Sequence, residues 1–429
     1  MERNAMKLLE KWKNKKNRKP LIIKGARQVG KTWLMKEFGK RYFKYTAYIN
    51  MDNNKRMREA FDTDYDIDRI LDVVNIETGV KINPEETLII FDEIQESPRA
   101  IASLKYFCEN APEYAIVVAG SLLGVAIHKG VSFPVGKVDT IELHPLSFRE
   151  FLAAVGEGGL VRVIDKMDEK LLSIYKSKYV DWLKKYYYIG GMPEVVSNYI
   201  DNRDFKEVRY LQNKIIEMYE NDFSKHTSTR ELPRIRMVWN AIPMQLAKEN
   251  KKFFFGKIKQ GARAKDFEVA IEWLQDCGLI KKVYKVNKPA MPLKAYIDFS
   301  AFKLFLLDVG LLGALSDLDA KSILEGNIIF TEFKGALTEQ YVLQQLVSDT
   351  KYIPYYFTEK KSEGEIDFII QKESDIIPIE VKAEENLKSK SLKVFCDKYK
   401  PKNAIRSSMS DYRKQDWLEN IPLWAISKL

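Results

Sequence analysis

A loop between residues 21 and 32 holds the side chains best suited to bind phosphate. It reads Leu-Ile-Ile-Lys-Gly-Ala-Arg-Gln-Val-Gly-Lys-Thr, an apolar run followed by the pattern G-x-x-x-x-G-K-[ST]. Glycines let successive N–H groups point at one centre, and the N-terminus of a following helix adds positive dipole character there. Lys31 would reach the β- and γ-phosphates of a nucleoside triphosphate, and the Thr32 hydroxyl would bind Mg²⁺. The predicted nucleotide-binding residues are Gly25, Ala26, Arg27, Gln28, Val29, Gly30, Lys31 and Thr32.

Two acids end a second apolar run, Thr87–Glu93. A strand buried on both faces is apolar throughout, so Asp92 and Glu93 would lie at its C-terminal end, where open α/β sheets bind ligands. Asp92 would share the Mg²⁺ with Thr32, and Glu93 would polarise the attacking water. Ser121 follows the next apolar strand and would contact the γ-phosphate or the water, although Ser after Gly is also an ordinary turn residue. Glu93, Lys31 and Ser121 are therefore the predicted catalytic residues.

These candidate residues would meet at one edge of a sheet if strands and helices alternate along the chain. This alternation runs across Pro20–Leu143 and predicts an α/β fold, the doubly wound parallel sheet of a P-loop NTPase. We expect an ATPase domain at residues 1–155, a helical lid or linker at 156–235, a winged-helix-like domain at 236–300 and a small C-terminal domain at 301–429.

Composition limits the class of protein. With 429 residues, 45% of them hydrophobic and 30% charged, the chain has an ordinary soluble composition and room for two to four domains. No apolar run of membrane-spanning length and no signal-peptide core is evident, and the three cysteines and three histidines are scattered. These features predict a cytoplasmic protein without a membrane partner or a zinc site. The net charge of +10 includes the basic runs 11–19, 248–265 and 388–402, which would either contact nucleic acid or form a solvated surface.

Several segments together resemble one known family. Gly-Ala-Arg-Gln-Val-Gly-Lys-Thr, Ile-Phe-Asp-Glu-Ile-Gln-Glu, Ala-Gly-Ser and Pro-Leu-Ser-Phe-Arg-Glu-Phe are similar to segments of the bacterial and archaeal AAA-type ATP-binding proteins, which carry an N-terminal AAA+ module and an uncharacterised C-terminal region. Tyr188–Glu194 resembles the Gly-Gly-x-Pro segment of these proteins. The resemblance implies ATP and Mg²⁺ as cofactors and ATP hydrolysis as the activity. The choice of ATP over GTP rests on it, because no motif identifies a base pocket.

The chain departs from this family at one position. Members often have Gly-Arg before the fifth strand, a candidate arginine finger, whereas this chain has Gly136-Lys137. A lysine is a point charge and cannot make the planar two-oxygen contact of an arginine. Arg149 is another candidate finger, with a structural salt bridge as the alternative.

Two segments in the middle of the chain each have alternative interpretations. The run Tyr186-Tyr187-Tyr188 is either a binding surface or internal packing. Helices at Phe254–Gln260 and Lys265–Cys277, followed by strands near Gly278–Tyr284 and Ala295–Phe299, resemble a winged helix. Its second helix would read DNA in the major groove, but an acidic stripe on that helix would be repelled by phosphates. The stripe consists of Glu268, Glu272 and Asp276. We therefore predict a protein–protein or interdomain role for this module.

A second candidate site lies near the C-terminus. Asp367 lies on a predicted strand, and Glu380 and Lys382 share one face of the next strand. Glu339 lies within the apolar stripe of an upstream helix, where a carboxylate is costly without a partner. This set resembles the PD-(D/E)XK nuclease superfamily. The resemblance implies that Asp367 and Glu380 would hold Mg²⁺, that Lys382 would assist the attacking water, and that Glu339 would support the metal. The alternative is an inert scaffold or binding module of the same fold.

Three functional classes follow. The first is an ATP-dependent switch that acts on a protein partner or through self-association, and it is our prediction. The second is an ATP-regulated DNA-binding protein or nuclease, favoured by the C-terminal carboxylates and the basic runs. The third is a nucleotide-binding scaffold that hydrolyses little, and the presence of Glu93 argues against it.

Overall fold

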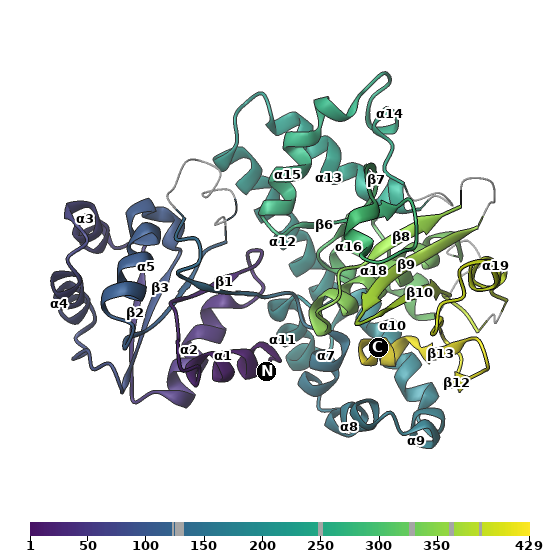
Figure 1. The fold of residues 1–429 in the computed structure, drawn as a ribbon, viewed down its shortest axis with the longest axis horizontal. Coiled ribbons are helices and arrows are strands. Elements are labelled where there is room, and N and C mark those ends of the chain that lie inside the picture. Colours follow the sequence, from purple (N-terminus) through teal and green to yellow (C-terminus); the bar gives the residue numbers. More distant parts are fainter. Residues whose placement is uncertain (122–123, 125–132, 248–251, 326–330, 360–363, 386–387) are drawn as a thin grey trace. The chain divides into compact units, whose positions relative to one another are not determined.

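The computed structural model of residues 1–429 describes the chain except for 122–123, 125–132, 248–251, 326–330, 360–363 and 386–387. The described residues form two compact units (Figure 1). The N-terminal unit comprises Glu2–His144 and Asp276–Leu279, and the C-terminal unit comprises Met1, Pro145–Gln275 and Ile280–Leu429. The sequence predicts a boundary at 155. The units divide earlier because helix α7 (Phe148–Ala154) packs in the C-terminal unit, where the rings of Phe148 and Tyr186 lie 5.5 Å apart.

A five-stranded sheet forms the centre of the N-terminal unit, and the described strands pair in the order β2-β3-β4-β1-β5. Every pairing is parallel, which confirms the predicted parallel α/β fold. Strands β3 and β4 are buried along their whole length, as the apolar runs 88–91 and 115–119 predict. The strands are β1 (Leu21–Lys24), β2 (Tyr45–Asn50), β3 (Thr87–Asp92), β4 (Ala115–Ala119) and β5 (Asp139–Glu142).

Helices cover this sheet. Ile22 of β1, Phe91 of β3 and Val118 of β4 belong to one core cluster with apolar side chains of α3, α4 and α5. Helix α2 packs against β2, β3, β4 and α1, where the rings of Trp12 and Phe38 lie 6.2 Å apart. The helices of this unit are α1 (Ala5–Lys13), α2 (Lys31–Tyr42), α3 (Lys55–Thr63), α4 (Ile67–Thr78), the 3₁₀ helix η1 (Ile94–Glu96) and α5 (Pro98–Asn110).

The first part of the C-terminal unit is helical. After α7 come α8 (Gly158–Lys166), α9 (Glu169–Ile174), α10 (Lys176–Ile189), α11 (Pro193–Asn202), α12 (Phe205–His226), α13 (Leu232–Leu246), α14 (Phe255–Ile258), η2 (Ala264–Asp266) and α15 (Glu268–Asp276). Tyr186, Tyr187 and Tyr188 at the end of α10 are all buried, so the tyrosine run is internal packing and not a binding surface.

The Gly-Gly turn between α10 and α11 has a structural cause. Gly190 has φ +75°, and a Cβ there would lie 2.1 Å from Oδ1 of Asp308. The N–H of Gly191 donates to Oδ2 of the same carboxylate at 2.6 Å. This segment is therefore explained by packing and hydrogen bonding, because only glycine admits the Asp308 side chain so close to the backbone.

The second part of the C-terminal unit contains an eight-stranded mixed sheet, with the described strands in the order β12-β13-β11-β10-β9-β8-β6-β7. The predicted wing strands, β6 and β7, form an antiparallel pair, but β6 also pairs in parallel with β8. They therefore extend the C-terminal sheet, and β7 crosses the predicted boundary at residue 300. The strands are β6 (Ile280–Val286), β7 (Ile297–Leu306), β8 (Tyr355–Thr358), β9 (Glu365–Lys372), β10 (Asp375–Val381), β11 (Ile405–Ser408), β12 (Arg413–Lys414) and β13 (Glu419–Pro422).

The remaining helices of this unit are η3 (Leu293–Tyr296), α16 (Val309–Leu315), α17 (Ala320–Glu325), α18 (Thr331–Asp349), α19 (Lys390–Tyr399) and η5 (Leu423–Lys428). The gaps given above aside, no helix of the structure has both the length and the apolar character needed to cross a membrane. None of the three described cysteines, Cys108, Cys277 and Cys396, is in a disulfide.

Candidate nucleotide-binding site

The predicted phosphate loop connects the end of β1 to the first residue of α2. Gly25 has φ +147°, and a Cβ at this position would lie 2.3 Å from the carbonyl oxygen of Leu143, so glycine is required there. Gln28 (φ 65°) and Gly30 (φ 90°) also have left-handed backbones. The loop therefore curls tightly before Lys31 starts the helix, as the sequence pattern predicts.

The Lys31 ammonium lies inside this loop. Its Nζ donates to the carbonyl oxygens of Gly25 at 2.8 Å and Ala26 at 2.7 Å, and the residue is 7% exposed. Burial lowers the pKa of Lys31 to about 8, although the carboxylates of Glu93 and Asp92 favour the charged form. A phosphate would replace the carbonyl oxygens as the acceptor and would stabilise the ammonium by its negative charge.

The predicted metal-binding pair is in contact. Thr32 Oγ1 donates to Asp92 Oδ2 at 2.5 Å, and the Tyr48 hydroxyl donates to the same oxygen at 3.1 Å. Burial and the Asp92 carboxylate raise the pKa of Tyr48, which keeps its hydroxyl protonated and able to donate. Hydroxyl and carboxylate oxygens are ligands that Mg²⁺ prefers. The residues present therefore fit an Mg²⁺–nucleotide: an oxygen pair for the metal beside a curled loop and a lysine for the phosphates.

The other two predicted catalytic residues form a short hydrogen-bonded chain. Ser121 Oγ donates to Glu93 Oε2 at 3.2 Å, and Arg27 Nε donates to Ser121 Oγ at 3.2 Å. Gln95 Nε2 donates to the same Glu93 oxygen at 2.7 Å. The Glu93 carboxylate thus accepts hydrogen bonds from Ser121, which follows β4, and from Gln95, which follows β3.

Strand order explains why these side chains meet. Strand β4 pairs with β1 on one side and with β3 on the other, and all three run in parallel. The loop after β1, Asp92 and Glu93 at the end of β3 and Ser121 after β4 therefore lie at one edge of the sheet, where α/β folds bind ligands. The structure brings every predicted residue of this site together, and the roles assigned to them stay predictions.

Sequence reasoning missed three residues of this site. Tyr48 bonds to Asp92, and Gln95 bonds to Glu93. Arg3, which precedes α1, donates to the carbonyl oxygens of Val29 at 3.0 Å and His144 at 2.6 Å. Gln95 follows the acidic pair by two residues and could have been noted. Neither Tyr48 nor Arg3 belongs to a motif, and their contacts span 44 and 26 residues of sequence.

The candidate arginine-finger positions both carry ion pairs. Lys137 Nζ lies 2.8 Å from Glu109 Oε1. Arg149 pairs with Asp165, and its Nη1 lies 4.0 Å from Asp349 Oδ2. The salt-bridge interpretation of Arg149 is therefore the one that its contacts support.

Asp367 and Glu380 of the second candidate site lie on a hairpin, as predicted, and Lys382 directly follows it. Strands β9 and β10 pair antiparallel up to Phe368–Ile379, so Asp367 and Glu380 come next on each strand. Asp367 Oδ2 accepts a hydrogen bond from the N–H of Val381 at 2.8 Å, and Lys382 Nζ lies 2.8 Å from Glu380 Oε1. Within the part of the chain that the structure describes, no three His, Cys, Asp or Glu side chains lie close enough to hold a metal ion.

Glu339 has a partner that the sequence did not reveal. It is 4% exposed within the buried stripe of α18, as predicted, and its Oε2 lies 3.6 Å from Nζ of Lys303 on β7. Lys303 is 0% exposed and also bonds to Glu365. Burial alone would lower the pKa of Lys303, but the carboxylates of Glu365, Glu339 and Asp367 outweigh it and raise the pKa. The ammonium therefore offsets part of the negative charge of these acids.

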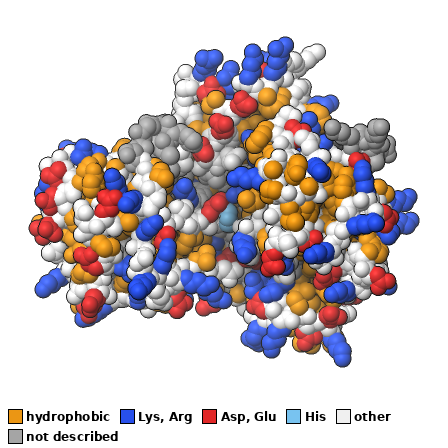
Figure 2. Space-filling view, in the orientation of Figure 1, with side chains coloured by type: hydrophobic (Ala, Val, Ile, Leu, Met, Phe, Trp, Pro, Cys, Tyr) orange, Lys and Arg blue, Asp and Glu red, His pale blue; other side chains and the backbone are white. Residues whose placement is uncertain are grey.

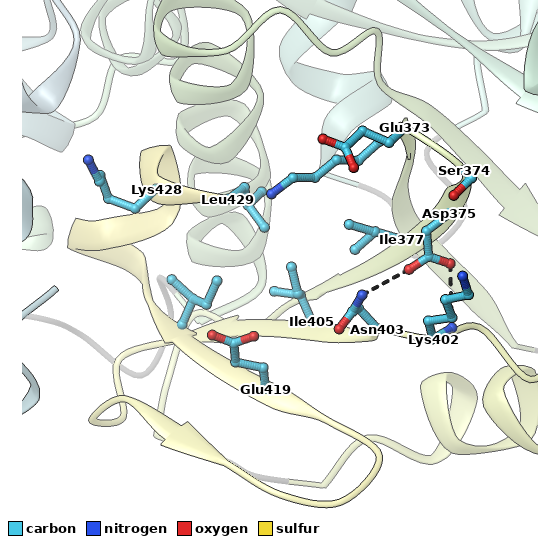
Figure 3. A pocket seen from close by; sticks show the side chains of 12 residues that line it. Glu373, Ser374, Asp375, Ile377, Lys402, Asn403, Ile405, Glu419, Lys428 and Leu429 are labelled. Atoms are coloured by element: carbon cyan, nitrogen blue, oxygen red, sulfur yellow. Dashed lines mark hydrogen bonds between the residues drawn. The ribbon is translucent and has the colours of Figure 1, made fainter.

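A separate pocket lies beside the β9–β10 turn (Figure 3). Asp375 accepts hydrogen bonds from Asn403 Nδ2 at 2.9 Å and from the Lys402 N–H at 3.4 Å, and side chains of both charge signs surround it. None of the predicted site residues lines this pocket, so we assign it no role in the chemistry.

Two of the basic runs, 11–19 and 388–402, are partly neutralised. Of the third run, 248–265, residues 248–251 lie outside the described residues. Lys15 pairs with Asp139 at 2.9 Å, Lys393 with Asp397 at 3.0 Å and Lys398 with Glu359 at 2.8 Å. Figure 2 shows Lys and Arg side chains interspersed with Asp and Glu on the visible faces of both units. This distribution favours the solvated-surface interpretation of the runs.

Comparison with known proteins gives three matches to family models. Residues 17–152 match a model described as an AAA domain. Residues 180–322 and 334–426 each match a model described as a domain of unknown function, DUF8612 and DUF4143. The last two descriptions name no winged helix and no nuclease, so those two interpretations stay predictions.

Solved structures show distant similarity. A Walker-type ATPase of Pyrococcus abyssi is 15% identical, with 73% of this chain and 95% of that chain covered and a TM-score of 0.47. The ORC1 protein of Aeropyrum pernix in complex with DNA is 12% identical (73% and 90% covered, TM-score 0.26), and Drosophila ORC bound to DNA is 13% identical (76% and 95% covered, TM-score 0.26). TM-scores below 0.5 mark all three as distant similarities. No curated protein matches the chain. The AAA-domain match, on a parallel sheet that carries the phosphate loop, supports a nucleotide-binding ATPase of the AAA type in the N-terminal unit.

Proposed function

We propose that this chain is an Mg²⁺-dependent ATPase whose nucleotide state controls a protein partner. The observation that carries the catalytic part is the contact within two pairs at one edge of the sheet: Thr32 of α2 with Asp92, and Glu93 with Ser121. The first pair offers oxygen ligands for a metal, and the second offers a positioned carboxylate for a water. Phosphoryl transfer to water requires both.

The roles of the chain's own residues follow from these contacts. Lys31 would leave the loop carbonyls to hold the β- and γ-phosphates, while Thr32 and Asp92 would hold Mg²⁺. The bound Mg²⁺ would neutralise charge on the phosphate oxygens. Glu93 would orient the attacking water and accept its proton, and Ser121 and Gln95 would fix the orientation of that carboxylate.

Turnover of Mg²⁺-ATP tests the catalytic part. We expect Lys31→Ala to lower turnover by about 100-fold or more, and Glu93→Gln to lower it by a similar factor while ATP still binds. Arg41→Ala serves as the control, because Arg41 pairs with Glu37 on the surface of α2. Equal turnover by wild type and Lys31→Ala would show that another site or a contaminant hydrolyses ATP, and the proposal would fail.

The partner part rests on helix α15. Ala270, Ile271 and Leu274 are buried, and Glu268 and Glu272 are exposed, as the helical spacing predicts, whereas Asp276, the third acid of the predicted stripe, is only partly exposed. An exposed acidic face disfavours phosphate backbones and suits a basic protein surface. We expect duplex DNA to leave Mg²⁺-ATP turnover unchanged. Stimulation by DNA that Lys31→Ala abolishes would contradict the partner assignment.

A DNA-cleaving activity is the second candidate. The observation in its favour is the placement of Asp367 and Glu380 at neighbouring positions of two paired strands, with Lys382 beside Glu380. Mg²⁺-dependent nicking of plasmid DNA that is lost in Asp367→Ala and kept in Arg41→Ala would establish it. An absence of nicking under conditions where ATP is hydrolysed would reject it.

A further inference from the structure

We propose that Arg27, from the phosphate loop itself, supplies the cation for the γ-phosphate that other ATPases of this type take from an arginine finger of a neighbouring subunit. This inference rests on the proposed ATPase function. It assigns a catalytic role in the same chain to a loop residue that the pattern G-x-x-x-x-G-K-[ST] leaves unspecified.

Arg27 lies on the side of the loop that faces the catalytic carboxylate. Its Nε donates to Ser121 Oγ at 3.2 Å, and that oxygen donates to Glu93 Oε2 at 3.2 Å. Since Glu93 would hold the attacking water, a cation two hydrogen bonds from Glu93 would lie near the phosphoryl group that this water attacks. Lys31 lies on the inner side of the same loop, bonded to Gly25 and Ala26.

The chemistry of the guanidinium fits this position. Phosphoryl transfer spreads negative charge over three equatorial oxygens, and an arginine stabilises it through a planar fork of N–H donors. A guanidinium carries five N–H donors, and the one on Nε of Arg27 bonds to Ser121. The side chain is partly exposed, and a phosphate oxygen would compete for its donors with its present partners.

The finger positions of the family offer no replacement. Lys137 pairs with Glu109 at 2.8 Å, and Arg149 pairs with Asp165 in the C-terminal unit. Arg27 is instead fixed to the catalytic edge by sequence, because it lies four residues before Lys31 in a loop with a defined backbone. A cation supplied in this way makes hydrolysis independent of a second subunit.

Two measurements on the full-length chain test the proposal. The first is steady-state turnover of Mg²⁺-ATP by wild type, Arg27→Ala, Arg27→Lys and the control Arg41→Ala. We expect Arg27→Ala to lower kcat by about 100-fold or more with little change in KM, Arg27→Lys to recover part of the loss, and Arg41→Ala to match wild type. The specific activity of wild type should not change with protein concentration or on mixing with Lys31→Ala protein.

The second measurement does not need turnover. Equilibrium titration with ADP and with a non-hydrolysable ATP analogue compares affinities with and without a γ-phosphate. We expect Arg27→Ala to bind ADP within twofold of wild type and the analogue about tenfold more weakly. A structural role in the loop would weaken both ligands equally, and that result would overturn the proposal.

The experiments give different results if the inference about Arg27 is wrong and if the proposed ATPase function is wrong. If wild type hydrolyses ATP and Arg27→Ala retains more than half of its kcat, Arg27 is not catalytic and the ATPase assignment stands. If wild type activity falls on mixing with Lys31→Ala protein, the cation comes from a neighbour and the inference is wrong. If wild type shows no turnover above Lys31→Ala, the proposed function fails, and the ratio of the two affinities still decides whether Arg27 contacts the γ-phosphate.

Discussion

Single residues of the candidate site take their positions from the backbone around them. The Lys31 ammonium bonds to two carbonyls of its own loop, and the Thr32 hydroxyl bonds to an acid at the end of another strand. Both contacts follow from where a strand ends and a helix begins. Supporting residues such as Tyr48, Gln95 and Arg3 then fix the groups that would touch the nucleotide.

Arg3 makes the first prediction. Its guanidinium is buried and bonds to the carbonyls of Val29 in the loop and His144 after β5. We expect Arg3→Ala to leave these carbonyls without this donor and to weaken ADP and ATP-analogue binding alike, by about tenfold, or ~1.4 kcal/mol. Equilibrium titration checks this, with Lys7→Ala on the exposed side of α1 as the control. Unchanged affinity in Arg3→Ala would show that the loop keeps its shape without the brace.

At the scale of elements, two buried charged groups connect parts of the C-terminal unit. Asp308 caps α16 through the N–H of Leu311 at 3.1 Å and accepts from Gly191 and from Gln344 of α18. Lys303 of β7 lies with Glu339 of α18 and Glu365 of β9. The Asp308 carboxylate and the Lys303 ammonium thus provide hydrogen-bond or ion-pair partners for polar groups that are buried where several elements pack together.

Asp308 is predicted to stabilise the junction of α10, α11, α16 and α18. Asp308→Ala removes a cap and leaves the buried Gly191 N–H without its acceptor, so we expect a loss of about 3 kcal/mol in the free energy of unfolding. Asp308→Asn keeps one acceptor oxygen and should lose less. Chemical denaturation measures both, and the matched control is Asp319→Ala, at an exposed acid that directly precedes α17 and accepts a hydrogen bond from the Ser322 N–H. Equal stability of Asp308→Ala and Asp319→Ala would contradict this role.

Lys303 leads to a prediction about stability and pH. Because its pKa is raised, Lys303 is protonated in the folded protein at neutral pH. Its contribution to the free energy of unfolding is constant below the ordinary lysine pKa of 10.5 and is lost as the pH rises above that value. Lys303→Met leaves Glu339 and Glu365 without this ammonium, so we expect a loss of about 3–5 kcal/mol at pH 7.

The same variant should respond to acid in the opposite sense from an ordinary destabilised protein. Uncompensated burial raises the pKa of a carboxyl, so the variant should recover stability relative to wild type as the pH falls from 7 toward 5. Adding Glu339→Gln to Lys303→Met should recover part of the loss at pH 7. A loss that is independent of pH and unaffected by Glu339→Gln would show that packing of the lysine stem, and not its charge, is what matters.

At the scale of the whole molecule, the chain consists of two compact units with cores of their own. One core cluster joins the five-stranded sheet to α3, α4 and α5, and another joins β8, β9 and α19. The residues of the candidate nucleotide site all belong to the N-terminal unit. Unfolding need not be all-or-none in such a chain.

Ligand binding should therefore stabilise one unit selectively. We expect calorimetry to show two unfolding transitions, one of which rises in temperature with Mg²⁺ and an ATP analogue. At 100 times the dissociation constant the stabilisation is about 2.7 kcal/mol. Lys31→Ala should remove the shift. A single transition that moves as a whole would show that the two units unfold together.

The sequence by itself determined the parts of this protein that depend on local chemistry. The phosphate loop, the acids at the end of β3 and the glutamate inside the apolar stripe of α18 each follow from residue types at fixed spacing along one element. Helical and strand periodicity then predicted which faces are buried, as in α15. These features need no information about distant parts of the chain.

Only the tertiary structure decided which elements lie next to each other. Pairing of β4 between β1 and β3 brings Ser121 to Arg27 and Glu93, and pairing of β6 with β8 merges the predicted wing with the C-terminal sheet. The approach of β7 to α18 gives Glu339 its partner Lys303 across 36 residues of sequence. The physical reason is that strand order and side-chain pairing depend on long-range hydrogen bonding and packing, for which the local pattern of residues carries no signal.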